Sequence, residues 1–77
     1  MGIQASVGRA GFNLPIDVQI VQGLLQQNLK WLGLVVPVRI TGVCDNQTIY
    51  LIESFQTRVM NISDPTGRVD PNSQTGN

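Results

Sequence analysis

The chain has 77 residues, 42% of them hydrophobic and 13% charged, and its five Lys and Arg balance its five Asp and Glu. This length gives one small domain, and zero net charge without a basic run argues against nucleic acid or an acidic membrane surface as a partner. With no histidine and one cysteine, the chain lacks the ligands of a usual zinc site and a base for a serine or cysteine nucleophile, so we expect no enzyme activity, no metal and no cofactor.

The first part of the chain, residues 1–13, is rich in glycine and alanine and lacks hydrophobic periodicity, which predicts an extended lead-in to the domain. No basic region followed by an apolar run is present, so we expect no Sec-type signal peptide. The start fits the myristoylation pattern M-G-x-x-x-S, but a pattern this short is common by chance. The longest apolar run, residues 32–38, is too short to span a bilayer, so no membrane insertion is expected.

A first helix is predicted for residues 14–32. Asn13 offers an N-cap, Pro15 suits the first turn, and Gly33 is a left-handed C-cap candidate. Gly23 lies inside the helix, where glycine costs about 1 kcal/mol relative to alanine. It is either a tolerated surface glycine or a place where a partner approaches closely. The apolar stripe of this helix comprises Val18, Val21, Leu24, Leu25 and Leu29.

A connector and a second helix follow. Residues 34–40 are β-branched and interrupted by Pro37, which predicts an extended connector or an edge strand. A tight turn at Gly42 leads to Asp45, which offers an N-cap for a helix over residues 46–60. The predicted core face of this helix comprises Thr48, Leu51, Ile52, Phe55 and Val59. The predicted polar side comprises Gln47, Glu53, Ser54 and Gln56.

The chain ends with the pattern of another helix start. Asp70 looks like a cap and Pro71 like a helix-starting proline, but a third helix would be truncated or very short before Asn77. We therefore expect the chain to be part of a longer protein. The predicted fold is all-α, with two main helices packed antiparallel through a long extended connector, in a domain over residues 14–75 followed by a tail at residues 76–77.

The centre of the chain, TGVCDNQTIYLIESFQ, resembles the repeat of the peptidoglycan-binding-domain-1 family, D-G-x-F-G-P-x-T-x-x-A-(V/I)-x-x-F-Q. The matching positions here are Gly42, Thr48, Ile52, Phe55 and Gln56. The family's first-helix pattern, D-V-x-x-(V/L)-Q-x-L-L, is matched by Asp17, Val18, Val21, Gln22, Leu24 and Leu25. A second turn of the family keeps Gly67, Val69 and Thr75. The turn chemistry departs from the family, because Thr41 replaces its Asp and residues 45–47 replace its Gly-Pro-Lys.

The flanking segments SVGRAGFNLPIDV and PTGRVDPNSQT are similar to a sub-group of that family found in proteins associated with bacterial type VI secretion. The resemblance implies a non-catalytic peptidoglycan-binding module that targets a longer bacterial protein, such as a secretion effector. Such a protein would be cytoplasmic before export and would act in the periplasm or cell wall of the target. The alternative is a protein-interaction module that docks an effector onto the secretion spike or a partner domain, because the family's turn residues are lost at Asp45 and Asn46.

Five residues are candidates for ligand binding. Peptidoglycan offers sugar faces, N-acetyl groups and peptide carboxylates, so a binder needs an aromatic platform, amide groups and an arginine. Tyr50, predicted to lie off the core face, is a platform candidate, against an ordinary half-buried tyrosine. Asn46 and Gln47 stand at the helix start, where free N–H groups bind carboxylates, against simple capping. Arg39 and Arg68 flank the two turns and could clamp a carboxylate, against solvated charges.

Two further residues are expected to be structural. Trp31, at the end of the first helix, is predicted to pack in the core or at its rim rather than stack on a ligand. Cys44 stands next to a helix start, which lowers a thiol pKa, but with no base nearby it is expected to be buried and inert.

Overall fold

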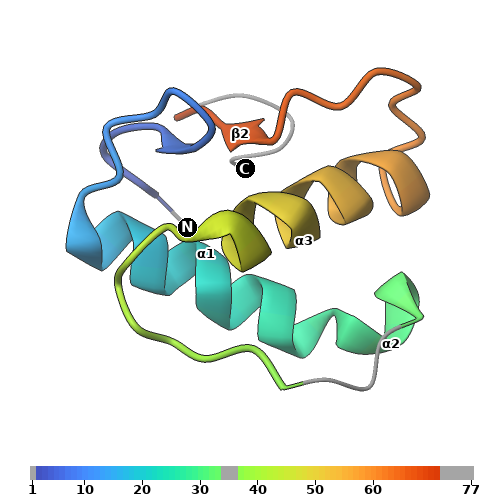
Figure 1. The fold of residues 1–77 in the computed structure, drawn as a ribbon, viewed down its shortest axis with the longest axis horizontal. Coiled ribbons are helices and arrows are strands. Elements are labelled where there is room, and N and C mark those ends of the chain that lie inside the picture. Colours follow the sequence, from blue (N-terminus) through green and yellow to red (C-terminus); the bar gives the residue numbers. More distant parts are fainter. Residues whose placement is uncertain (1, 34–36, 72–77) are drawn as a thin grey trace.

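The computed structural model describes residues 2–33 and 37–71. In chain order its elements are β1 (Val7–Gly8), α1 (Pro15–Gln27), α2 (Leu29–Leu32), α3 (Asn46–Arg58) and β2 (Arg68–Val69). These residues form a small, mostly helical fold, which agrees with the predicted class in its broad outline (Figure 1). The all-α prediction misses one feature, because β1 and β2 pair as a two-stranded antiparallel sheet, with Val7 opposite Val69.

The segment before α1 is more ordered than an extended lead-in. It carries β1 and then a tight loop in which Asn13 does not cap α1, since Leu14 occupies the N-cap position without a side-chain bond. Asn13 instead has a φ of 58°. Its Oδ1 accepts from the Gly8 N–H at 2.7 Å, and its Nδ2 donates to the carbonyls of Gly8 and Gly11 at 3.2 Å each. The short amide side chain therefore serves as the hydrogen-bond partner of the loop backbone, a use that competes with capping.

The predicted first helix is two helices. α1 ends at Gln27, and Asn28 interrupts the helix with φ −108° and ψ 11°. The side chain of Asn28 donates to the Leu24 carbonyl at 2.7 Å, and the same carbonyl also accepts from the Asn28 backbone N–H at 3.1 Å, so Asn28 closes the end of α1 with both groups. The single turn of α2 then ends at Gly33, whose φ of 68° confirms the predicted left-handed C-cap.

The two long helices run in the same direction, and the antiparallel prediction is wrong (Figure 1). The connector explains this arrangement because it returns along α1. The Val38 N–H donates to the side chain of Gln26 at 2.6 Å, and further along the chain the Thr41 N–H donates to the side chain of Gln22 at 2.8 Å. Extended backbone covers more than twice the length per residue of a helix, so the connector reaches the start of α1 before α3 begins.

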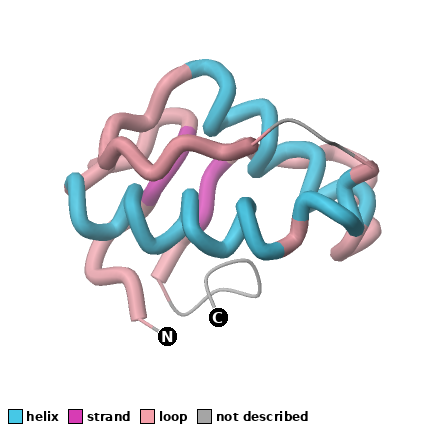
Figure 2. Tube along the Cα trace, turned by 90° about the horizontal axis from the view of Figure 1, so that it is seen from below, coloured by secondary structure: helices cyan, strands magenta, loops and turns pink. Residues whose placement is uncertain are grey.

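The core lies between α1, α3 and the sheet, whose two strands lie side by side in Figure 2. Its buried hydrophobic residues are Ile3, Val7, Val18, Val21, Leu25, Leu32, Val38, Leu51, Ile52 and Val69. The predicted stripes are confirmed at their centres, while Leu24, Leu29 and Phe55 are half-buried and Val59 is exposed just beyond α3. Ile3 and Val7 come from the segment that was expected to lie outside the domain.

Three expectations concern the connector, the C-terminal part and the membrane. Residues 37–40 form no strand, and residues 34–36 lie outside the described residues. The expected third helix falls on residues 72–77, which also lie outside them. Within the part that the structure describes, no helix has the length and apolarity needed to cross a membrane.

Candidate functional site

Two Thr-Gly turns have the same local structure. The first turn is Thr41, Gly42 and Val43, and the second turn is residues 66–68. In each, the threonine hydroxyl accepts from the N–H two residues further on, at 3.1 Å in the first turn and 3.2 Å in the second. The glycines have φ of 80° and 71°, a left-handed conformation that other residues adopt at a cost.

A buried glutamine of α1 holds the first turn. The Oε1 atom of Gln22 accepts from the N–H groups of Thr41 and Gly42 at 2.8 and 3.0 Å. Its Nε2 atom donates to the Val43 carbonyl at 3.0 Å and to the Thr48 hydroxyl at 3.1 Å. Gln22 is only 1% exposed, so these bonds are what makes the burial of its amide favourable.

Gln56 of α3 holds the second turn in the same way. Its Oε1 accepts from the Gly67 N–H at 2.9 Å, and its Nε2 donates to the Thr66 hydroxyl and the Arg68 carbonyl at 3.1 Å each. Gln56 is 2% exposed, so the prediction that it lies on the polar side of the helix is wrong. Spacing offered a signal, because Gln56 follows buried Ile52 by four residues.

The start of α3 is fixed by a cap that connects to the first turn. The Asp45 carboxylate accepts from the Thr48 N–H at 2.9 Å and from its hydroxyl at 2.8 Å, which confirms the predicted N-cap. The bond from the Thr48 N–H, and then that from its hydroxyl, lowers the pKa of Asp45 below its ordinary value. Because the same hydroxyl accepts from Gln22, cap, turn and α1 form one hydrogen-bonded unit.

Three of the five candidate residues lie together on this fixed helix start. Asn46, Gln47 and Tyr50 occupy the first two turns of α3, and all three are exposed. Tyr50 lies four residues after Asn46 and three after Gln47, so the three side chains are neighbours on one part of the helix surface. We call them the α3 start surface. Tyr50 is 56% exposed, which leaves its ring accessible to a ligand.

The two candidate arginines lie elsewhere. Arg68 is in β2, and it pairs with Asp70: its Nε lies 2.9 Å from one carboxylate oxygen, and its Nη2 donates to the other at 3.5 Å. Arg39 is exposed on the connector, between Val38 and Thr41, which are both bonded to α1. The structure therefore places Arg39 beside α1 and Arg68 at the second turn, rather than both at the α3 start surface.

The second turn is covered by the N-terminal segment. The Arg9 N–H donates to the Gly67 carbonyl at 2.9 Å, and the Arg9 guanidinium pairs with Glu53 of α3 at 3.3 Å. The first turn is more open, because Val43 is 64% exposed and Ile40 before it is 54% exposed. The N-terminal segment thus covers the second turn, whereas the first turn is exposed to solvent.

The two residues that were expected to be structural behave differently. Trp31 is 69% exposed, so the prediction that it packs in the core or at its rim is wrong. It lies on the single turn of α2, whose one buried residue is Leu32. Cys44 is half-buried, and burial raises the pKa of its thiol more than the nearby Gly8 N–H lowers it. The thiol is therefore protonated at neutral pH, and Cys44 is less buried than expected.

Within residues 2–33 and 37–71, no three His, Cys, Asp or Glu side chains gather where they could hold a metal ion. What these residues do offer is an exposed aromatic ring and two amides on a rigid helix start. No protein-family model matches the chain, and the searches of curated proteins and of solved structures find no significant match.

Proposed function

We propose that this chain is a non-catalytic module that binds peptidoglycan and targets a longer bacterial protein, such as a type VI secretion effector, to the cell wall. The observation that carries the proposal is the α3 start surface, in which the exposed Tyr50 stands beside Asn46 and Gln47. The bonds of Asp45, Thr48 and Gln22 hold this helix start in one conformation, and a preorganised surface loses less entropy on binding.

Each group has a role that suits a wall fragment. The Tyr50 ring supplies an apolar face for the C–H side of a sugar, with its hydroxyl in water. The amides of Asn46 and Gln47 both donate and accept, which matches an N-acetyl group. This arrangement binds without needing either Arg39 or Arg68.

The test is retention of the purified, folded chain by purified sacculi. We expect the wild-type chain to be retained, Tyr50→Ala to weaken retention about tenfold, which equals about 1.4 kcal/mol, and Tyr50→Phe to retain most of the affinity because it keeps the ring. Thr57→Ala, an exposed position two turns further along α3, is the matched control and should bind normally. Absence of retention by the folded wild-type chain, when an intact wall-binding domain is retained in the same assay, would contradict the proposal.

The second candidate is docking of a longer protein onto a secretion spike or a partner domain. It is favoured by the apolar side chains near the first turn, Ile40 and Val43, which are exposed to water. We expect Val43→Asp to abolish such docking while leaving sacculus binding intact, because Val43 lies outside the α3 start surface. Co-purification with a candidate spike protein, with and without this substitution, separates the two functions.

A further inference from the structure

Trp31 and Arg58 place an indole ring and a guanidinium group at the same end of the molecule. Trp31 is 69% exposed on the single turn of α2. The Nη1 atom of Arg58, in the last turn of α3, donates to the Leu32 carbonyl at 2.8 Å. Because Leu32 follows Trp31 directly, the bonded geometry of the chain puts this nitrogen within roughly 9 Å of the Trp31 Cα. One small ligand can therefore reach both groups.

The guanidinium is held in place and is still open to a ligand. Its bond to Leu32 closes the end of α2, a common use of arginine at a helix end. It also occupies the space beside Gly33, where a Cβ atom would lie 2.9 Å from Nη1. Arg58 is nevertheless exposed, and among the described residues it forms no ion pair. Most of its five N–H donors remain for a ligand, and a side chain that is already held loses less entropy on binding.

The charges around this end of the molecule are positive. The sequence from residue 18 to residue 44 contains no Asp or Glu, and Lys30, directly before Trp31, is exposed. The carbonyl ends of α1 and α3 each contribute about half a negative charge. The two full positive charges of Lys30 and Arg58 exceed that contribution, so an anionic group is attracted here.

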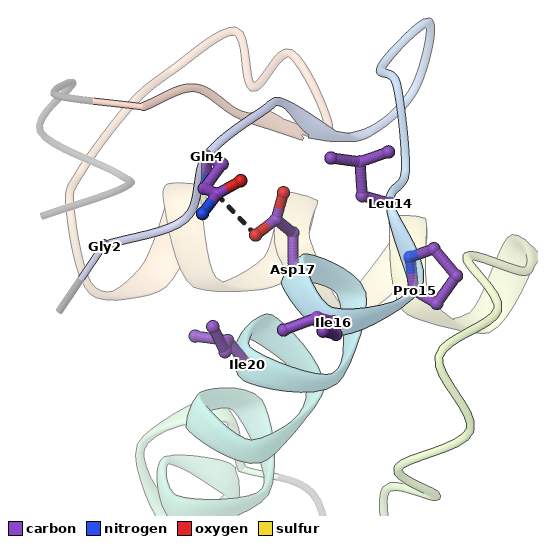
Figure 3. Close-up of a pocket in the computed structure, with 7 residues that line it drawn as sticks. All are labelled: Gly2, Gln4, Leu14, Pro15, Ile16, Asp17 and Ile20. Atoms are coloured by element: carbon purple, nitrogen blue, oxygen red, sulfur yellow. Dashed lines mark hydrogen bonds between the residues drawn. The ribbon is translucent and has the colours of Figure 1, made fainter.

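The pocket beside the start of α1 is a different kind of surface (Figure 3). Its volume is about 220 Å³, and its walls are mainly apolar, formed by Leu14, Pro15, Ile16 and Ile20. Its one ionised group, Asp17, is 3% exposed and accepts from the N–H groups of Gln4 and Ala5 at 3.1 and 3.0 Å. The pocket thus presents no free charge, and a charged ligand finds a better partner at the end of α2.

We propose that Trp31 and Arg58 form a second ligand contact, which binds a carboxylate of the wall peptide. This inference rests on the proposed function, in which the α3 start surface contacts the sugar and its N-acetyl group. A guanidinium binds a carboxylate through two parallel hydrogen bonds, which a lysine cannot provide. The indole ring packs on the aliphatic part of the peptide next to that carboxylate.

The spacing along α3 allows one wall fragment to engage both contacts. Arg58 follows Tyr50 by eight residues, which is about 12 Å along the helix axis. An extended peptide of four residues spans up to about 14 Å. A sugar at Tyr50 and a peptide carboxylate at Arg58 can therefore belong to the same fragment.

The test uses the fluorescence of Trp31, which is the single tryptophan of the chain. We expect the free stem peptide released from peptidoglycan to change this emission with a dissociation constant on the order of 1 mM. The same peptide with its carboxylates amidated should bind about tenfold more weakly, and Arg58→Gln should weaken binding of the unmodified peptide by a similar factor. Arg39→Gln removes an exposed arginine from the connector, and as the matched control it should bind normally.

A second variant is needed because Arg58→Gln also removes the bond to Leu32. Trp31→Ser changes an exposed side chain, so circular dichroism should show an unchanged fold. An NMR titration that follows the Gly33 amide should show weaker binding of the stem peptide to this variant than to the wild-type chain. Wild-type affinity in folded Trp31→Ser would overturn the proposal.

Failure of this inference differs from failure of the proposed function. A wild-type chain that is retained by sacculi, but whose Trp31 emission does not respond to the stem peptide, would contradict the second contact alone. A chain that responds to the stem peptide without being retained by sacculi would support this contact and contradict the wall function. Inorganic phosphate that binds as tightly as the stem peptide would also overturn the proposal, because Arg58 would then bind anions without selecting the peptide.

Discussion

The first and second turns are built alike but lead to different structures. Each has a threonine, a glycine with positive φ and a buried glutamine from the preceding long helix, and in each an Asp follows the glycine by three residues. After the first turn, Asp45 caps α3. After the second turn the chain forms β2, and Asp70 pairs with Arg68. The same local chemistry therefore does not decide which element follows.

The segments packed against each turn decide which element follows it. β1 and Arg9 lie over the second turn, and β1 supplies backbone partners to Arg68 and Val69. The first turn has α1 on one side and solvent on the other, as the exposure of Val43 shows. The second turn thus has a structural role, because it is packed against β1 and Arg9, while the first turn supports the α3 start surface. We expect substitutions at the second turn to change stability alone, and those at the first turn to change stability and binding together.

The largest expected effect comes from removing the glutamines. Gln22→Met and Gln56→Met fill similar space but remove the bonds to the turns, which leaves buried N–H and carbonyl groups unpaired. We expect each to lower the free energy of unfolding by about 3 kcal/mol, with Gln22→Met the more severe because Gln22 makes more bonds. Urea unfolding measures both. A loss below about 1 kcal/mol for either variant would show that the turn does not depend on its glutamine.

A smaller effect, confined to one turn, is expected from Gly8→Ala. A Cβ atom at Gly8 would overlap the Gly67 carbonyl oxygen, and the φ of 118° at Gly8 disfavours any side chain. We expect a loss of about 2 kcal/mol as β1 separates from β2. Hydrogen exchange should speed up at Gly67 and Arg9 but not at Gly42. Gly2→Ala, where a Cβ meets nothing within 4 Å, is the control and should change neither quantity. Equal loss of protection at both turns would mean that they unfold as one unit.

The smallest effect is expected from removing the Asp45 N-cap, which follows the first turn and has no counterpart after the second turn. Asp45→Ala should cost about 1 kcal/mol. The pKa of Asp45 is lowered in the folded state, so its contribution is complete above the unfolded-state pKa of about 3.9 and is lost as the pH falls through the lower folded-state value. Thermal melts between pH 2 and 7 should therefore show a smaller acid-induced loss for Asp45→Asn, which keeps an acceptor but cannot titrate. An unchanged acid profile would assign the acid sensitivity to other carboxylates.

Much of the fold follows from local patterns. The core stripes of both long helices, the left-handed Gly33 and the Asp45 cap all depend on residues within a few positions of one another. The sheet could not be predicted in this way, because strands of two residues have no periodicity. The shared direction of α1 and α3 depends on side chains of α1 that bind the connector, and these bonds join residues 12 and 19 positions apart.

The candidate site likewise has parts that follow from local spacing and parts that depend on long-range contacts. Tyr50, Asn46 and Gln47 are neighbours because helical spacing makes them so. The placement of Arg39 and Arg68 away from them depends on the path of the connector and on the pairing of β2. The pocket at α1 had no signal in the sequence, since its wall combines Ile20 with Gly2 from a segment that was expected to lie outside the domain.

Local sequence patterns predict most of the two long helices, their apolar faces and the positions of the tight turns, because these depend on short-range sterics and on the 3.6-residue repeat of the helix. The tertiary structure alone decided which polar groups are buried. Gln22 and Gln56 look like surface residues until two turns, distant in sequence, supply partners for both ends of each amide. The physical reason is that burial of a polar group is favourable only when its hydrogen bonds are met, and here the groups that meet them come from other parts of the chain.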